Sequence, residues 1–263
     1  MHTALSPCAA HDMTPRAVVA AARARRLDAI AVTDHNSARQ VRAVVDAAKR
    51  FGITVIPGME VRTREDVHLV CLFDTVEQAE AWGEVVYENL PPLANREAVY
   101  GCQLLFDGSD QPVGREERLL LTACDLSVEQ VVTGVRKLGG LVIPAHVDRQ
   151  AYGLLTILGL FPPDLELRVA EVAGGEEAVA ALRRFPYSGG VCFYAASDAH
   201  RLEEIGIHPT CFYLKEVSVA ELGMAFRGMR GRKVVMCPNG RAGQGRHSRM
   251  VRHPMSSGAG RSC

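Results

Sequence analysis

The sequence lacks the features that would assign it to a membrane, to a secretory route or to nucleic acid by charge alone. No apolar run approaches 18 residues, and the N-terminus has no basic segment followed by an apolar one. Lys plus Arg equals Asp plus Glu, at 30 each, so no overall charge favours nucleic acid or a membrane as partner. We therefore expect neither a signal peptide nor a membrane span.

The eight cysteines also lack any paired spacing. None forms a Cys-x-x-Cys motif, and several lie in apolar, strand-like runs, where a free thiol behaves as a small hydrophobe. Scattered cysteines in a chain of this size are typical of a reducing compartment, so we expect a cytoplasmic protein.

The sequence has enough hydrophobic residues to form a core, and its expected strands and helices alternate. Of its 263 residues, 48% are hydrophobic and 23% charged, which is enough apolar material for a full core. About seven strand–helix alternations favour an α/β fold, as a closed or nearly closed barrel. The expected strands are 29–32, 53–58, 67–72, 141–145, 165–172, 191–196 and 211–214, and the expected helices 15–27, 36–51, 76–88, 127–138, 176–184 and 219–230. Residues 89–124 read as a helical or hairpin excursion.

The pattern dissolves after residue 235 into Gly, Arg, Ser and Pro, with several Arg and no acidic residue. We expect one domain over residues 1–235, followed by a disordered basic tail over residues 236–263. Weak attraction of this tail to nucleic acid is the alternative to plain solvated disorder.

Three expected strands end in side chains of the metal-ligand type. Asp34 and His35 follow the strand 29–32, His146 follows the strand 141–145, and Asp198 and His200 follow the strand 191–196. Groups just past the carboxyl ends of such strands face the ligand crevice of α/β folds. A single histidine of this kind is more often a hydrogen-bonded structural residue, but most of the nine histidines lie on or near expected strands, and this concentration weakens that interpretation. Their mixture with carboxylates suits Zn²⁺, Mn²⁺ or Fe²⁺ rather than Ca²⁺ or Mg²⁺.

Six short motifs occur in order along the chain: His2-Thr3, Thr33-Asp34-His35-Asn36, Gly58-Met59-Glu60-Val61, His68-Leu69, Pro144-Ala145-His146 and Ser197-Asp198-Ala199-His200. Together they resemble the PHP (polymerase and histidinol phosphatase) family of metal-dependent phosphoesterases, over about residues 1–235. The resemblance implies a distorted (β/α)7, TIM-like barrel with two or three divalent ions at the C-terminal mouth of its strands.

The same resemblance implies roles for individual residues. His2 and Asp198 would hold the first ion, and Glu60 would bridge to a second ion held by His68 and His146. A third ion would lie on His35 and His200. The catalytic side chains would be Asp34, orienting a ligand or a water molecule, and Arg149, contacting phosphate. An ion pair of Arg149 with Asp148 or another acid is an equally open interpretation.

Two positions depart from the family pattern. The family begins with His-x-His, whereas this chain begins at the middle position, Met1, from which we expect that the true start lies upstream. Where the family often places an Asp or His for the third ion, this chain has Pro7 and Cys8. Cys8 is a candidate thiolate ligand, with an inert buried thiol as the alternative and His11 or Asp12 as substitutes.

These observations predict a metal-dependent phosphoric ester hydrolase. A metal-bridged hydroxide would attack the phosphorus of a small phosphomonoester or a nucleotide, with nucleic acid only as a short substrate. One alternative is a catalytically impaired barrel that acts as a binding or regulatory module. A second alternative is a metal-dependent amidohydrolase, which we disfavour because no Lys ends an expected strand before the late motif. The sequence does not indicate an oligomeric state.

Overall fold

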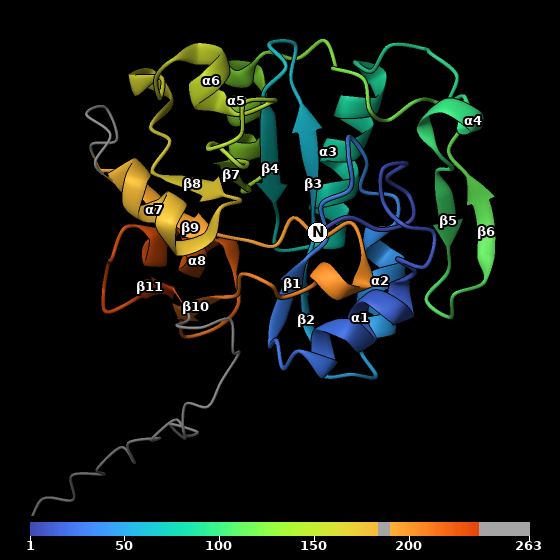
Figure 1. The fold of residues 1–263 in the computed structure, drawn as a ribbon, viewed down its shortest axis with the longest axis horizontal. Coiled ribbons are helices and arrows are strands. Elements are labelled where there is room, and N and C mark those ends of the chain that lie inside the picture. Colours follow the sequence, from blue (N-terminus) through green and yellow to red (C-terminus); the bar gives the residue numbers. More distant parts are fainter. Residues whose placement is uncertain (184–189, 237–263) are drawn as a thin grey trace, which may run out of the picture.

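The computed structural model describes residues 1–183 and 190–236 (Figure 1). The helices are α1 (Pro15–Ala24), α2 (Val41–Ala48), α3 (Val76–Glu88), α4 (Glu97–Tyr100), α5 (Val128–Lys137), α6 (Leu154–Leu158), α7 (Gly175–Arg183) and α8 (Val219–Phe226), with 3₁₀ turns η1 (Pro163–Leu165) and η2 (Leu202–Glu204). The strands are β1 (Ala29–Ala31), β2 (Thr54–Ile56), β3 (Gly58–Arg62), β4 (His68–Leu72), β5 (Leu104–Phe106), β6 (Pro112–Arg115), β7 (Leu141–Pro144), β8 (Val169–Val172), β9 (Cys192–Ala195), β10 (Thr210–Tyr213) and β11 (Lys233–Met236).

The strands confirm a mixed α/β fold. β1 pairs with β2, and β8 with β9, in parallel, whereas β3-β4-β7, β5-β6 and β10-β11 are antiparallel. Within the described ranges these form five sheets of two or three strands and no closed barrel, so the barrel itself stays a prediction. The antiparallel direction of β4 has a simple cause, because only residues 63–67 separate it from β3. A parallel connection needs a dozen residues or more.

The expected elements are confirmed most closely where the sequence carries capping signals. Helix α3 has the expected bounds, and α5 begins after Ser127, whose hydroxyl accepts a hydrogen bond from the Gln130 amide. The expected helix over 36–51 was too long, because α2 begins only at Val41. Asn36 has a φ of 48°, in the left-handed region, and cannot continue a right-handed helix. Strand β3 was not expected as a separate strand.

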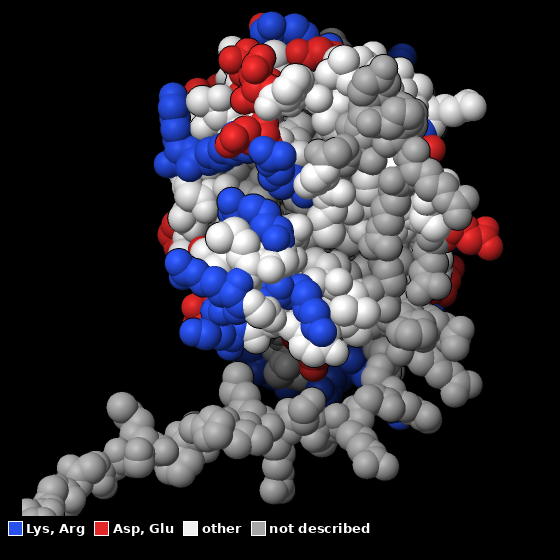
Figure 2. All heavy atoms as spheres, turned by 90° about the vertical axis from the view of Figure 1, so that its left-hand side faces the viewer, with Lys and Arg blue, Asp and Glu red and all other residues white. Residues whose placement is uncertain are grey.

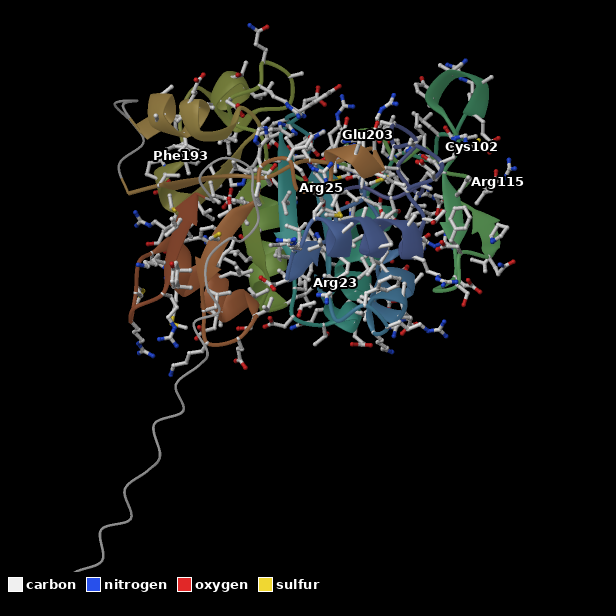
Figure 3. All side chains as sticks on the ribbon, turned by 60° about the horizontal axis from the view of Figure 1, so that its bottom comes forward. Arg23, Arg25, Cys102, Arg115, Phe193 and Glu203 are labelled. Carbon is white, nitrogen blue, oxygen red and sulfur yellow. The ribbon has the colours of Figure 1, made fainter. Side chains whose placement is uncertain are left out.

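The excursion over residues 89–124 forms both a short helix, α4, and the β5–β6 hairpin, which lies at one edge of the molecule, where Figure 3 labels Cys102 and Arg115. The excursion supports the N-terminal segment: the Leu104 amide donates to the Ala4 carbonyl at 2.9 Å. Gly101 has a φ of 97°, and a Cβ there would lie 2.3 Å from the Pro7 carbonyl oxygen, so only glycine fits. This contact sets the path of the residues that follow His2.

The N-terminal segment is also held in place by the segment that follows β9. The His2 amide donates to the Ala199 carbonyl at 2.9 Å, and the Ala10 amide to the His200 carbonyl at 2.8 Å. The guanidinium of Arg25, the residue that follows α1, donates to the Glu203 carbonyl at 2.9 Å (Figure 3). These hydrogen bonds hold the N-terminal segment with His2 beside the segment after β9, which carries Asp198 and His200.

Apolar side chains fill two clusters around this framework. The larger one joins α1, α2, α3 and α5 to the sheets, and the smaller one lies between β4, β7, β8, β9 and α8. None of the helices in residues 1–183 and 190–236 has the length and apolar content to cross a lipid bilayer. Of the expected tail, Met236 ends β11, and residues 237–263 lie outside the described residues.

Candidate metal centre

The structure brings the expected ligands of all six motifs to one place. His35 follows β1, Glu60 lies within β3, and His68 begins β4, while His146 follows β7. Asp198 and His200 follow β9, and His2 is held beside the end of β1 by the hydrogen bond from the Thr33 amide to the Met1 carbonyl at 2.9 Å. A backbone bridge pairs His35 with Glu60.

Glu60 lies at the middle of four histidines. Its Oε2 is 3.0 Å from Nδ1 of His35, 3.3 Å from Nδ1 of His68 and 3.6 Å from Nε2 of His2. Its Oε1 is 3.5 Å from Nε2 of His146. Burial raises the pKa of Glu60, but the surrounding histidines outweigh burial and hold the pKa well below its usual value. The glutamate is therefore an anion with imidazoles on several sides.

Asp198 completes the cluster on the side of His2. Its Oδ1 is 3.2 Å from Nε2 of His2 and 3.9 Å from Nδ1 of His200. The rings of His2 and His200 stack, with centroids 4.1 Å apart. Three groups of donor atoms lie close enough to hold an ion, namely His2 with His35 and His200, His35 with Glu60 and His68, and His2 with Glu60 and Asp198.

The donor set fits divalent metal ions. Ligand atoms about 2.1 Å from a tetrahedral ion lie roughly 3.4 Å from one another, which is close to the separations around Glu60. Burial and the neighbouring His35 and His200 lower the pKa of His2 to about 3, so this imidazole is neutral, as a metal ligand must be. His146 Nδ1 is buried without a hydrogen-bond partner.

Three residues at the centre have backbone conformations that are uncommon for side chains other than glycine. Asn36, His146 and Asp198 have φ values of 48°, 30° and 44°. Such conformations cost free energy and persist where the surroundings impose them, often at functional sites. At Asn36 the surroundings are visible: its Nδ2 donates to the carbonyls of Leu120 and Thr122, each at 2.8 Å.

Sequence reasoning missed Ser6, which connects Asp34 to His2. The Ser6 Oγ is 2.7 Å from Asp34 Oδ1, 3.0 Å from His2 Nδ1 and 3.1 Å from the His35 amide nitrogen. Asp34 Oδ1 accepts from the Thr3 amide at 2.6 Å, and Oδ2 from the Thr3 hydroxyl at 2.7 Å. A serine four residues after a ligand histidine was the only signal available in the sequence.

These contacts determine the tautomer of His2. The single hydroxyl proton of Ser6 goes to Asp34 Oδ1, which is an acceptor in either protonation state of Oδ2. One Ser6 lone pair accepts from the His35 amide, so the other must accept from His2 Nδ1–H. The Nε2 lone pair of His2 then faces the carboxylates of Asp198 and Glu60, an arrangement that is favourable with a cation between them. Asp34 is thus connected through Ser6 to His2, one of the expected ligands.

We predict that Ser6→Ala lowers metal affinity at His2 by roughly 10- to 100-fold, the usual cost of losing an outer hydrogen bond to a ligand histidine. The affinity is measured by competition with a chromogenic chelator. Ser109→Ala, at an exposed turn, is the matched control and should bind metal like the parent. Unchanged affinity in Ser6→Ala would refute the assigned tautomer.

Arg149 lies at the centre and pairs with a predicted metal ligand. Its Nη1 is 2.7 Å from Asp198 Oδ2, so the ion pair is with another acid and not with Asp148. The Asp148 carboxylate instead accepts from the amides of Ala173 and Gly174. Nearly half of the Arg149 side chain is exposed, which leaves guanidinium protons free for an incoming anion.

Cys8 is exposed, which does not fit the alternative of an inert buried thiol. Burial raises the pKa of this thiol, but hydrogen bonds to His200 and His35 outweigh it and lower the pKa to about 7. Burial also lowers the pKa of His35, but hydrogen bonds to Cys8 and Glu60 outweigh burial and raise this pKa to about 10. His11 and Asp12 are exposed, and, like Cys8 itself, they belong to none of the three donor groups.

Tyr152 borders the centre and had no signal in the sequence. Its ring stacks on His68 with centroids 4.4 Å apart and an interplanar angle of 4°, and the Arg62 guanidinium lies 4.6 Å from its centroid. The His68 amide donates to the Tyr152 carbonyl at 3.0 Å. Tyr152 therefore fixes both the backbone and the ring plane of His68.

A buried acid, Glu171 on β8, lies beyond the donor groups. It accepts a hydrogen bond from the Tyr194 hydroxyl at 3.2 Å, and its backbone carbonyl accepts from the Val147 amide beside His146. Burial, followed by the negative charge of Asp198, raises the pKa of Glu171 from 4.5 to about 7. The protonated acid is the form that suits this position.

This raised pKa predicts a pH dependence of stability in the chelator-treated protein. The contribution of Glu171 is fully present below about pH 4.5 and is lost as pH rises through about 7, up to about 3 kcal/mol. Glu171→Gln should therefore lose less unfolding free energy than the parent between pH 5 and pH 8. Urea unfolding at four pH values measures both slopes, and equal slopes would contradict the prediction.

Comparison with known protein families supports the resemblance that the motifs suggested. Residues 1–130 match the PHP domain, so the resemblance is confirmed and the chain carries a PHP domain. Comparison with curated proteins found no match.

Solved structures show the same fold at low sequence identity. Endonuclease Q from Pyrococcus furiosus, described as a lesion-specific endonuclease, has a TM-score of 0.61 and 17% identity over 89% of this chain. A complex of endonuclease Q with a 27-mer duplex carrying an abasic lesion gives the same TM-score and identity over 88% of this chain. This chain spans only 56% of the length of either. An amidohydrolase from Chromobacterium violaceum, solved with bound sulfate and no metal, has a TM-score of 0.55 and 20% identity over 78% of this chain and 88% of its own.

Proposed function

We propose that this chain is a metal-dependent hydrolase of phosphoric esters that acts on a small phosphomonoester or a nucleotide. The observation that carries the proposal is the position of Glu60, whose two carboxylate oxygens lie within 3.0–3.6 Å of nitrogens from four different histidines. Replacing buried charged groups by apolar residues is often neutral or stabilising, so stability alone does not explain a buried cluster of this composition. It is suited to divalent cations.

Two or three ions of Zn, Mn or Fe are the proposed cofactors. His2, Asp198 and Glu60 would hold the first ion, and Glu60, His68 and His146 would hold the second. His35, His200 and the Cys8 thiolate would hold the third. Bound divalent ions supply Lewis-acid activation of water and neutralise the charge of phosphate oxygens. The thiolate favours zinc or iron over magnesium at the third position.

The side chains around these ligands position them and the substrate. Asp34 and Ser6 hold His2 with its Nε2 lone pair toward the carboxylates, and Tyr152 holds the plane of His68. Arg149 presents a planar fork of N–H donors beside Asp198, which matches phosphate oxygens. A substrate phosphate at this position would take up donors that Asp198 leaves free.

An amidohydrolase remains the second candidate, because the Chromobacterium violaceum structure shares the fold. The exposed positions of the lysines favour the phosphoesterase over the amidohydrolase. All four lysines of the chain, Lys49, Lys137, Lys215 and Lys233, are exposed, whereas Glu60 and the histidines around it are buried. The lysine metal bridge that the amidohydrolase alternative expects is therefore not offered there.

The proposal also covers the catalytic domain, the kind of substrate and the location of the protein. Residues 1–235 form the catalytic domain, arranged as the distorted (β/α)7 barrel that the family resemblance implies. Nucleic acid enters the proposal only as a short substrate, as expected from the sequence. A cytoplasmic location, expected from the cysteine pattern, belongs to the same proposal.

Hydrolysis of p-nitrophenyl phosphate and bis(p-nitrophenyl) phosphate tests the proposal. The purified chain should hydrolyse at least one of them with added Mn²⁺ or Zn²⁺, and chelation should stop the reaction. His146→Ala should lower the rate by at least about 100-fold while the circular dichroism spectrum is unchanged. His11→Ala, an exposed histidine outside the donor groups, is the matched control. A metal-loaded protein that hydrolyses neither ester, nor short oligonucleotides, would favour the binding module instead.

A further inference from the structure

The structure contains a second concave site, far along the strands from the metal centre. A cavity of about 620 Å³ opens between α5, the first residues of β7 and β8, and α8. Its apolar wall includes Leu141, Val142, Val169, Val219 and Phe226, and the rest of the lining is mostly polar. The cavity lies at the beginning of β7, whereas His146 follows the end of that strand. A volume of this size falls within the range of small-molecule sites, roughly 300–1,000 Å³.

Three arginines surround this wall, and their charges are poorly compensated. Arg136 donates to the carbonyls of Leu165 and Glu166, and Arg227 donates to the Gly223 carbonyl. Among the carboxylates whose side chains the structure describes, none lies within ion-pair distance of either arginine.

The third arginine, Arg168, has one acidic neighbour. Its Nη2 is 3.9 Å from the Glu166 carboxylate, and both side chains are more than half exposed. Such a pair is weak in water. The cavity therefore carries three guanidinium groups against one carboxylate. Figure 2 shows the face on the side of α7 and β11, where Lys and Arg side chains gather in the left half of the view.

We propose that this cavity binds an organic phosphate with an aromatic or otherwise apolar body, of the size of a mononucleotide. The apolar wall removes the body from water, and the guanidinium forks of Arg168 and Arg227 pair with the phosphate oxygens. Concavity favours a small ligand over a nucleic-acid strand, which needs a groove that follows the backbone. The site is separate from the metal centre and does not depend on the proposed hydrolysis.

The test uses 8-anilinonaphthalene-1-sulfonate, an aromatic anion that no phosphatase hydrolyses and whose fluorescence rises in an apolar site. The full chain should bind one equivalent, and a non-hydrolysable phosphonate analogue of AMP should displace it. The double variant Arg168→Glu/Arg227→Glu should bind at least about tenfold more weakly, because charge-assisted hydrogen bonds are lost. Gly223→Phe keeps the charges but fills the cavity, and should weaken binding to a similar extent.

The controls separate this site from other anion-binding surfaces. Arg23→Glu, on α1 (Figure 3), should bind the probe like the parent, and so should His146→Ala at the metal centre. Equal affinity in all variants would overturn the proposal, as would loss of binding in His146→Ala alone. Displacement by a 12-nucleotide single strand but not by the AMP analogue would overturn it in favour of a nucleic-acid surface.

Discussion

Glu60→Gln is expected to purify with almost no bound metal and with no measurable phosphoesterase activity. Glu60 is the one side chain whose oxygens reach toward nitrogens of His2, His35, His68 and His146 together. A glutamine is neutral and has only one oxygen, so it can neither bridge two cations nor balance their charge. The loss in metal affinity should exceed about 100-fold, since changes beyond the ligands themselves already cost roughly 10- to 100-fold.

The measurement combines metal content with initial rates on a p-nitrophenyl ester. Glu84→Gln, an exposed glutamate on α3, is the matched control and should keep both properties. Glutamine nearly preserves the volume of glutamate, so the Glu60→Gln variant should show the parent's circular dichroism spectrum. Parental metal stoichiometry in Glu60→Gln would show that the cluster is not built around this carboxylate.

Asn36→Ala is expected to have the largest effect on stability, about 4 kcal/mol of unfolding free energy. The Asn36 side chain donates to the Leu120 and Thr122 carbonyls and accepts from the Arg62 amide at 3.0 Å. Each partner left unsatisfied in the interior costs about 1–3 kcal/mol. An alanine with the φ of 48° adds roughly 1 kcal/mol.

Asn36→Gly separates the two contributions, because glycine tolerates the positive φ but makes none of the hydrogen bonds. Denaturant unfolding should rank the parent above the glycine variant, and the glycine variant about 1 kcal/mol above the alanine variant. Because Asn36 adjoins His35 and ties the excursion to the centre, both variants should also lose metal affinity. A loss below about 1 kcal/mol in Asn36→Ala would contradict this account of the excursion.

The parts of the molecule that could be predicted from the sequence are those with local signals. Helix α3 has a capping box at Thr75, and β7 is a short β-branched run bounded by Gly140 and Pro144, so both were placed nearly residue by residue. The expected ligands His2, His35, Glu60, His68, His146, Asp198 and His200 could be named as a set because each lies at a strand or in a motif, and their role as ligands stays a prediction. Their convergence is a property of the fold.

The parts that could not be predicted depend on contacts distant in the sequence. The direction of β4 depends on the short turn after β3, and that turn was not recognised because β3 has only five residues, of which only two, Met59 and Val61, have large apolar side chains. The ion pair of Arg149 spans 49 positions to Asp198, and the positioning of His68 by Tyr152 depends on a loop with no local pattern. The link from Asp34 through Ser6 to His2 requires the N-terminal segment to lie beside β1, which only the tertiary structure brings about.

The central claim is that this buried cluster is a metal centre, and metal analysis of the purified chain tests it most directly. Plasma mass spectrometry after purification without chelators, and again after exposure to Zn²⁺ and Mn²⁺, gives the number of ions per chain. The account predicts two or three equivalents in the parent and far less in Glu60→Gln. Less than about one tenth of an equivalent under both conditions would contradict it, and the cluster would then be a structural set of histidines.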